Sequence, residues 1–308
     1  MNELVDSIAF GVVLPTLDPF RRGTVPLLPA ARLAEGLGFD SAWVGDHLTF
    51  HAPILESMCA LAAAAAVTDR IRLGFGVMLL GLRNPVWAAK QVGTLAALAP
   101  GRVLLGVGVG GEHAPEFEAA GVALNERGKR VDESLEIVTT LLRGRPVDHA
   151  GPLLPTRAPV LEPVPTAAVP LVVGGRSEAA LARAGRWADA WLAIWVDGPR
   201  LTRACGELAD RAAAHGRPTP KTLVMVFIHV CSDAAAGREE AAAFVEGQYG
   251  VPFAQIERWC MIGDEDDVVG CLVEIHDAGA AGFICLPAAR DPLGQYERLA
   301  LVRDRVPR

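Results

Sequence analysis

The sequence predicts an α/β fold, a (β/α)8 TIM barrel, from three observations. Eight short apolar segments recur along the 308 residues, and stretches with helical spacing separate them. The apolar runs are continuous rather than alternating, which is typical of parallel strands buried on both faces. No change in composition marks a second domain, and a barrel of about 250 residues or more is common as a single unit. We therefore expect one barrel domain over residues 1–308.

The expected elements alternate along the chain. The strands are expected at 8–14, 41–45, 71–78, 102–107, 171–173, 190–194, 222–230 and 282–286. The helices are expected at 26–38, 54–67, 85–97, 129–142, 177–188, 199–214, 265–278 and 293–303, and loop insertions at about 109–127, 144–169 and 234–262. Gly74 and Gly76 interrupt the third strand, which usually indicates a bulge or a close backbone approach.

Composition excludes several classes of function. The formal net charge of −7 argues against nucleic-acid binding, which a basic surface would drive. No apolar run reaches the roughly 18 residues that would span a bilayer, and no targeting segment precedes the first strand. Six cysteines lie far apart without a Cys-x-x-Cys pair, which argues against a disulfide framework or a structural zinc site. We expect a cytoplasmic protein that binds a small-molecule substrate, with no nucleic-acid or membrane partner.

Asp46 and His47 follow the second expected strand directly. In an α/β barrel the carboxyl ends of the strands carry the chemistry, because their loops open onto one face. Histidine titrates near neutrality, so His47 is a candidate acid, base or polarising group, and Asp46 is a candidate to orient it.

A metal site is the alternative for this region. Asp46, His47, His51, Glu112 and His113 supply suitable ligand atoms. The first strand is not followed by His-x-His, and neither Glu-x-x-His nor His-Glu-x-x-His occurs. We therefore expect no metal, and a metallohydrolase is the less favoured hypothesis.

Two glycine segments follow expected strands. Residues 106–111 match G-x-G-x-x-G, but Glu112, His113 and Pro115 follow where a dinucleotide-binding motif would begin a helix. The alternative is a wall without side chains, on which a flat ring can lie close to the backbone. In the second segment, Gly174-Gly175-Arg176-Ser177, the free N–H groups of the next helix and the arginine predict a phosphate site, against an ordinary capped turn.

Taken together, these residues resemble the luciferase-like monooxygenase superfamily of flavin- and F420-dependent oxidoreductases. The resemblance covers nearly the whole chain in the expected order. The matching stretches are 34–44, Asp46-His47, 68–74, 83–85, 89–90, 101–108, 174–175 and 188–191.

The resemblance implies a bacterial-luciferase-like TIM barrel with an insertion after strand seven, and a homodimer. Asp46-His47 at the end of strand two is similar to the branch that uses the deazaflavin coenzyme F420, with His47 at the reactive ring. It also implies a non-proline cis peptide bond between Gly76 and Val77, which backs the ring. Glycines 108, 110 and 111 would then hold the ring, and Gly174, Gly175, Arg176 and Ser177 the phosphate.

The expected activity is hydride transfer between F420 and a small organic substrate, with His47, Asp46 and Glu112 as catalytic residues. Two departures from the family pattern concern the substrate side. Gly111 stands where many relatives have a large aromatic or an acid, and Glu112 comes one place late. The alternatives are an FMN-dependent monooxygenase that uses O2 and a cofactor-binding barrel without turnover.

Overall fold

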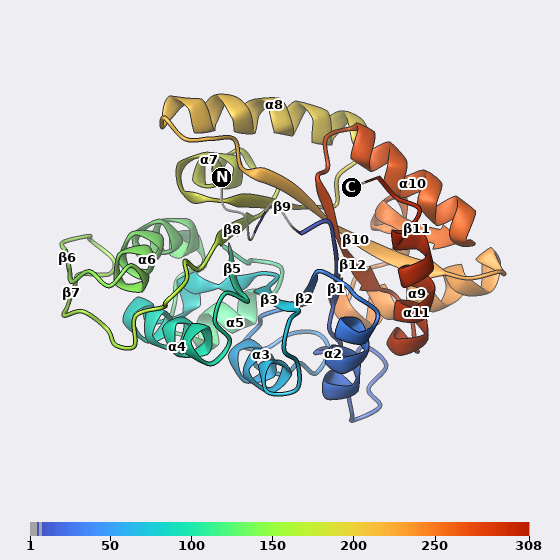
Figure 1. Ribbon diagram of the computed structural model, residues 1–308, viewed down its shortest axis with the longest axis horizontal. Coiled ribbons are helices and arrows are strands. Elements are labelled where there is room, and N and C mark those ends of the chain that lie inside the picture. Colours follow the sequence, from blue (N-terminus) through green and yellow to red (C-terminus); the bar gives the residue numbers. More distant parts are fainter. Residues whose placement is uncertain (1–4, 6–7, 308) are drawn as a thin grey trace.

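In the computed structural model, which describes Val5 and residues 8–307, eight parallel strands close into a barrel (Figure 1). Each strand pairs with the next along the chain, and the ring closes because β10 pairs with both β9 and β12 while β12 pairs with β1. The fold is therefore a (β/α)8 TIM barrel, as predicted. Its strands are β1 (Phe10–Val13), β2 (Ser41–Val44), β3 (Arg72–Phe75), β5 (Val103–Gly108), β8 (Leu171–Gly174), β9 (Ala190–Ile194), β10 (Lys221–Val230) and β12 (Gly282–Pro287).

Helices surround this ring in the order that the sequence predicts (Figure 1). Asn84 caps one of them, because its side chain accepts the N–H groups of Val86 and Trp87. None of the helices in the described part of the chain has the length and apolar character needed to cross a lipid bilayer. The helices are α2 (Leu27–Gly36), α3 (Ser57–Ala65), α4 (Pro85–Leu98), α6 (Arg127–Leu142), α7 (Glu178–Trp187), α8 (Gly198–Ala214), α9 (Ala234–Tyr249), α10 (Glu265–Asp277) and α11 (Pro292–Arg303).

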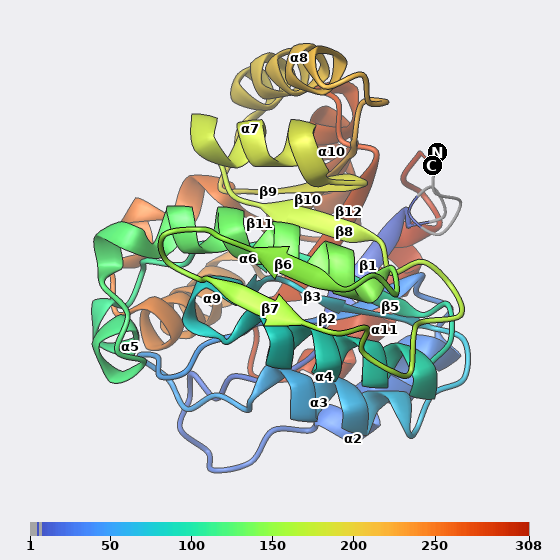
Figure 2. The same ribbon diagram turned by 90° about the vertical axis from the view of Figure 1, so that its left-hand side faces the viewer.

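Short elements fill the long connections. The expected strand at 71–78 is two strands, β3 and β4 (Met78–Leu79), and both pair with β5. The proline-rich segment forms an antiparallel hairpin of β6 (Val147–His149) and β7 (Thr156–Ala158). The hairpin lies outside the barrel at the left of Figure 1 and faces the viewer in Figure 2. β11 (Cys260–Gly263) pairs with β10. In the described part of the chain, four 3-10 turns complete the connections, at Leu80–Leu82, Leu124–Glu126, Phe253–Gln255 and Glu257–Trp259.

The sequence interpretation was wrong about residues 109–127, which we expected to be loop-like. This segment contains the helix α5 (Ala114–Ala119), and Pro115 lies in its first turn. Proline has no N–H to donate, and the first turn of a helix needs none there, so Pro115 favours the start of a helix instead of breaking it.

The interior of the barrel is filled by side chains. Trp43 is fully buried there and donates its indole N–H to Ser41 Oγ at 2.8 Å. A Cβ on Gly74 would lie 2.4 Å from the Trp43 ring, so the ring needs a glycine on the neighbouring strand. A filled interior leaves only the ends of the strands for ligands, and in this fold the carboxyl ends carry the site.

Candidate active site

A cavity lies at the carboxyl ends of the barrel strands. Apolar and aromatic side chains, among them Met225, Trp195 and Tyr249, make up much of the wall of this cavity. Gly111, Arg176 and Ser177 adjoin it in the chain but do not line it. The predicted site residues that do line it are Asp46, His47, Gly76, Val77, Gly108, Gly110, Glu112, Gly174 and Gly175.

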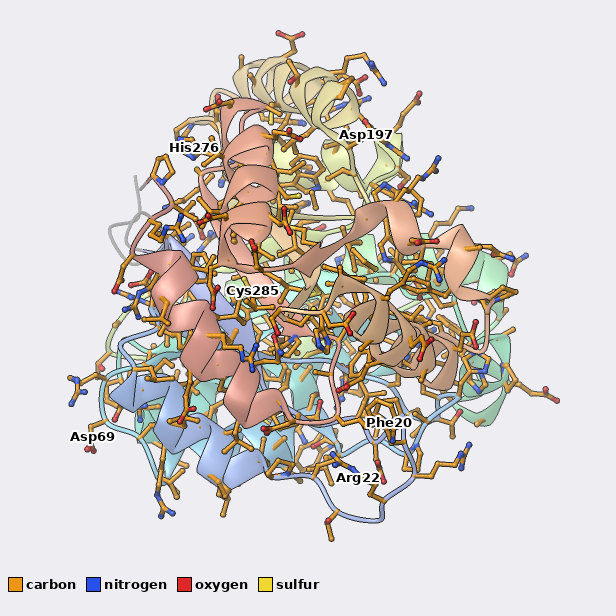
Figure 3. All side chains as sticks on the ribbon, turned by 90° about the vertical axis from the view of Figure 1, so that its right-hand side faces the viewer. Phe20, Arg22, Asp69, Asp197, His276 and Cys285 are labelled. Atoms are coloured by element: carbon orange, nitrogen blue, oxygen red, sulfur yellow. The ribbon has the colours of Figure 1, made fainter. Side chains whose placement is uncertain are left out.

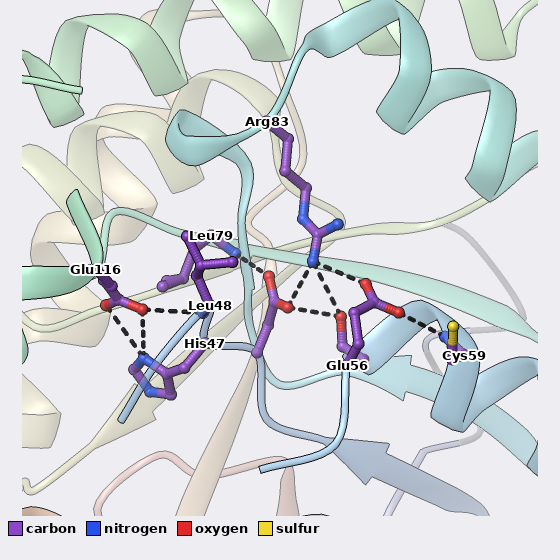
Figure 4. A network of polar contacts seen from close by, with 9 residues as sticks. His47, Leu48, Glu56, Cys59, Leu79, Arg83 and Glu116 are labelled. Atoms are coloured by element: carbon purple, nitrogen blue, oxygen red, sulfur yellow. Dashed lines mark hydrogen bonds and ion pairs between the residues drawn. The ribbon is translucent and has the colours of Figure 1, made fainter. Parts of the chain in front are cut away.

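His47 is held by a buried carboxylate of α5. Its Nδ1 lies 3.1 Å from Oε2 and 3.2 Å from Oε1 of Glu116 (Figure 4). Glu116 is 0% exposed and also accepts the backbone N–H of Leu48. The ring of Phe50 stacks on the imidazole, with the ring centroids 3.8 Å apart. Because an ionised carboxylate only accepts, Nδ1 donates to Glu116, and Nε2 is the nitrogen left for a ligand.

Asp46 does not orient His47, which corrects the expectation from the sequence. Its buried carboxylate accepts hydrogen bonds from Ser57 Oγ at 2.7 Å, from Leu79 N at 2.8 Å and from Arg83 Nη2 at 2.6 Å. These partners come from α3, β4 and the segment before α4. Asp46 therefore ties together the segments around the break between β3 and β4, and Glu116 takes the role that we had given to Asp46.

Arg83 joins two carboxylates in this network (Figure 4). Its Nη2 also lies 3.1 Å from Glu56 Oε1. Burial lowers the pKa of Arg83, but the charges and hydrogen bonds of Asp46 and Glu56 outweigh burial and raise the pKa overall. The guanidinium thus stays charged and compensates the buried carboxylate of Asp46.

Val77 forms one side of the cavity and packs on bare backbone. The peptide bond between Gly76 and Val77 is cis, as the resemblance predicts. A Cβ on Gly108 would lie 2.3 Å from Val77 Cγ2, and a Cβ on Gly174 would lie 2.7 Å from Val77 Cγ1. Both positions therefore require glycine if Val77 is to keep its place. The resulting wall has little relief and suits a flat ring, as the sequence interpretation expects.

Gly175 and Ser177 precede α7 next to this wall. Gly175 has a φ of +121°, which side chains with a Cβ rarely adopt. Ser177 Oγ accepts the N–H of Ala180 at 3.2 Å, so its hydroxyl caps the helix.

Three arginines gather near this helix start, and we call them the Arg176 cluster (Arg176, Arg200 and Arg258). Arg176 lies over the rings of Trp195 and Trp259, at 5.1 and 5.7 Å from their centroids. Arg200 donates to the carbonyl of Arg176, and Arg258 lies over Trp259. Burial and the charge of Arg200, with a smaller effect of Arg258, lower the pKa of Arg176. Like charges held together in this way favour an anionic ligand.

Glu112 and Tyr249 lie in the wall of the same cavity. Burial, with a contribution from the Glu112 charge, raises the pKa of Tyr249. The Tyr249 hydroxyl is therefore protonated at every physiological pH and can donate a hydrogen bond.

The candidate metal ligands of the sequence do not converge. Asp46 pairs with Arg83, and His47 with Glu116, while the rings of His51 and His113 meet at 4.8 Å. Over Val5 and residues 8–307, no group of three or more His, Cys, Asp or Glu side chains could hold a metal ion.

Comparison with known proteins supports the resemblance. The family model described as luciferase-like monooxygenase matches residues 26–282. The chain belongs to this family. Members of the luciferase-like family are oxidoreductases, so this chain is an enzyme of that class.

Curated relatives of this luciferase-like protein include proteins of Mycobacterium, Nocardia and Rhodococcus. An uncharacterised protein of Mycobacterium tuberculosis is 34% identical over 214 residues, which cover 63% of this chain and 73% of the relative. A protein of Nocardia farcinica named F420-dependent glucose-6-phosphate dehydrogenase is 32% identical, and the matched region covers 68% of this chain and 66% of the relative. A protein of the same name from Rhodococcus erythropolis is 28% identical, and the matched region covers 83% of this chain and 86% of the relative.

Solved structures share the luciferase-like fold. An F420-dependent secondary alcohol dehydrogenase in complex with an F420-acetone adduct superposes with a TM-score of 0.84 at 18% identity. The superposition covers 98% of this chain and 99% of the dehydrogenase chain. Monooxygenase RslO1 from Streptomyces bottropensis gives 0.81 at 22% identity, over 96% of each chain. At these identities the likeness concerns the fold alone.

Sequence reasoning missed four polar residues of this luciferase-like site, namely Glu116, Arg83, Arg200 and Arg258. Glu116 stood in a segment interpreted as loop, although Pro115 was a signal for a helix start. Arg83 was noted only within a matching stretch. Arg200 and Arg258 carry no local signal, because only the folded chain places them next to Arg176.

Proposed function

We propose that this luciferase-like oxidoreductase transfers a hydride between coenzyme F420 and a small organic substrate. The observation that carries the proposal is the pairing of His47 with the buried Glu116 at the edge of a cavity that has a flat glycine wall. The relatives named F420-dependent glucose-6-phosphate dehydrogenase support the choice of coenzyme.

In this proposal each side chain has a physical task. F420, when bound, supplies a ring that accepts or donates a hydride. Val77 and the bare backbone at Gly108 and Gly174 support that ring from one side. Glu116 keeps the Nδ1 proton of His47 in place, so that Nε2 of the neutral ring accepts the hydroxyl proton of the substrate when a hydride leaves the adjoining carbon. In the reverse direction the protonated Nε2 polarises the carbonyl oxygen of the substrate and returns that proton to it. Glu112, whose acid role stays a prediction, lies in the same wall.

The Arg176 cluster favours F420 over FMN. A single phosphate needs one arginine and a helix start, which Arg176 and α7 supply. Arg200 and Arg258 add two further positive charges. That excess suits the longer anionic tail of the deazaflavin coenzyme. An FMN-dependent monooxygenase is the competing function.

The first test is a fluorescence titration of the apoprotein with F420 and, separately, with FMN. We expect F420 to bind at least about tenfold more tightly, a difference of about 1.4 kcal/mol. Arg176→Gln should weaken F420 binding. Arg186→Gln is the matched control, because Arg186 also lies over a tryptophan, Trp187, but at the other end of α7. Tighter binding of FMN would overturn the proposal and make O2 the co-substrate to test.

Four further expectations stay predictions. They are the homodimer, the cytoplasmic location, the single domain over residues 1–308 and the absence of nucleic-acid and membrane partners. The non-catalytic alternative would be favoured by tight F420 binding without turnover of any alcohol, aldehyde or ketone.

A further inference from the structure

The side of the active-site cavity that lies away from the glycine wall is apolar. In the closed ring of eight strands, β12 lies four places from β5 and β1 lies four places from β8, so these pairs face each other across the barrel. Leu286 of β12 and Val13 of β1 therefore line the cavity opposite Gly108 and Gly174. Both side chains are buried, and Leu17 extends their surface. A ligand that covers the coenzyme ring meets hydrocarbon on this side.

Aromatic side chains continue this wall from His47. The ring of Phe50, which stacks on His47, lies 5.7 Å from that of Tyr249, and the Tyr249 ring lies 5.4 Å from that of Trp195, measured between centroids. Trp195 in turn stacks on Trp259 at 6.2 Å, with 21° between the ring planes. Tyr249 and Trp195 line the cavity itself. A substrate whose reacting oxygen lies at Nε2 of His47 thus has its body beside two aromatic side chains.

The backbone of Trp195 is strained. Its φ is +54°, a left-handed conformation that a bulky side chain rarely adopts. Trp195 lies between the end of β9 at Ile194 and the start of α8 at Gly198. Asp197, labelled in Figure 3, caps α8 by accepting the N–H of Arg200 at 2.9 Å, so the connection is fixed at both ends. Strain of this kind collects at functional sites, which points to a role for the Trp195 ring in the cavity.

The charged groups of the cavity wall do not suit an anionic substrate. Among the described residues that line the cavity, none is a lysine or an arginine, and the carboxylates are those of Asp46 and Glu112. Arg83 pairs with Asp46 and also with Glu56, so two carboxylates match its charge. Burial first, and then the charge of Glu112, raise the pKa of Tyr249 in the same wall. A phosphate or carboxylate of the substrate would lie beside Glu112 without a cation of the wall to compensate it.

The arginines next to the cavity are engaged by other groups. Burial lowers the pKa of Arg176 and the charge of Glu112 opposes that effect, so Arg176 is the cation that Glu112 acts on. In the proposed function, the anionic tail of the coenzyme binds the Arg176 cluster. Arg127 packs against Gly111, where an added Cβ would lie 3.1 Å from its Nε, and donates to the carbonyl of Leu124. With the coenzyme bound, the cavity wall offers a second anion no partner among the described residues that line it.

We propose that the substrate is an uncharged alcohol or ketone whose apolar or aromatic body lies between the coenzyme ring and the side chains of Trp195, Tyr249 and Leu286. This inference rests on the proposed function and adds the substrate class to it. In the oxidation, the carbinol carbon gives its hydride to the coenzyme, Nε2 of His47 takes the hydroxyl proton, and the carbon–oxygen bond becomes a carbonyl. A sugar phosphate, which the names of two relatives contain, does not fit the charges of this wall.

The test titrates the F420-saturated protein calorimetrically with three probes. Cyclohexanone has a body of the expected class and does not react with the oxidised coenzyme. Cyclohexanecarboxylate has the same ring with a charged group, and glucose 6-phosphate is a sugar phosphate. We expect cyclohexanone to bind at least about tenfold more tightly than cyclohexanecarboxylate, because the carboxylate would be buried without a cation. Glucose 6-phosphate should neither bind nor bleach the absorbance of the coenzyme.

Variants assign the preference to the cavity wall. Trp195→Leu should weaken cyclohexanone binding about three- to tenfold, as expected for the loss of an aromatic contact, and Trp195→Phe should recover part of that binding. Trp87→Leu is the matched control, because Trp87 lies on α4 outside the cavity and is 68% exposed, so the affinity for cyclohexanone should not change. Glu112→Gln should strengthen the binding of cyclohexanecarboxylate several-fold, because the substitution removes a repelling charge.

The outcomes separate this inference from the proposed function. If F420 binds but cyclohexanecarboxylate or glucose 6-phosphate binds as tightly as cyclohexanone, the substrate class is wrong and the proposed function stands. The same conclusion follows if Trp195→Leu leaves cyclohexanone binding unchanged. If F420 itself does not bind, the proposed function fails, and this inference fails with it.

Discussion

The Nδ1 atom of His47 lies 3.1 Å from Oε2 of Glu116, a carboxylate that is 69 residues away in the chain and has no exposed surface. This pair joins the end of β2 to α5. Since the carboxylate can only accept, it selects the ring tautomer that leaves Nε2 without the proton when the ring is neutral. The chemistry that we propose for His47 depends on that selection.

Glu116→Ala should change the tautomer of His47. With no acceptor at Nδ1, the proton should move largely to Nε2, and the change is visible in nitrogen–proton correlation spectra of the imidazole. Turnover should fall by about 10- to 100-fold, which corresponds to a charge-assisted hydrogen bond of about 1.5–3 kcal/mol. Glu116→Asp, which keeps an acceptor, should recover part of the Nδ1 tautomer and part of the turnover. An unchanged spectrum would show that Glu116 does not position His47.

Asp46→Asn should act mainly on stability. The substitution leaves Arg83 without the buried half of its ion pair, and we expect the free energy of unfolding in urea to fall by about 2–4 kcal/mol. Glu56→Gln is the matched control, because Glu56 also pairs with Arg83 but its side chain is 44% exposed, so it should cost less than about 1 kcal/mol. If Asp46→Asn folds with normal stability yet loses turnover, Asp46 takes part in the chemistry after all.

Gly108→Ala should disturb the wall of the cavity. The new Cβ would lie 2.3 Å from Val77 Cγ2, so Val77 must move. We expect a loss of about 1–3 kcal/mol in stability, as is usual for overpacking, together with weaker F420 binding. Adding Val77→Ala removes the clashing methyl groups and should restore stability in a double-mutant cycle. Gly270→Ala is the control, because the new Cβ meets nothing within 4 Å, and it should leave the stability of the protein unchanged. Additive effects of the two substitutions would contradict this account.

His51 should make stability depend on pH. Burial first, and then the charges of His113 and His47, lower the pKa of His51 below its ordinary value of 6.5. The unfolded chain therefore takes up this proton at a higher pH than the folded chain does. The stability that His51 contributes is present above pH 6.5 and is lost as pH falls toward the lowered pKa.

His51→Gln removes this titration. Urea unfolding between about pH 8 and pH 5 should then show a shallower loss of stability toward acid than in the wild-type protein. The same slope in both proteins would show that His51 is not responsible.

Local patterns in the chain were sufficient for the architecture. Every barrel strand was predicted, because parallel strands buried on both faces need continuous apolar runs that a single sequence displays. The break in the third strand was signalled by Gly74 and Gly76. The segment with α5 was misjudged, because Pro115 was interpreted as a breaker where it begins a helix.

The sequence by itself determined the (β/α)8 barrel, the position of Asp46 and His47 at the end of a strand, and the glycines beside Val77. Those features follow from periodicity and from steric limits that act over a few residues. Only the tertiary structure decided that His47 pairs with Glu116, that Asp46 pairs with Arg83, and that Tyr249 meets Trp195 in the cavity wall. A side chain finds its partner through the distances between loops that barrel closure brings together, and no local pattern in the chain encodes those distances.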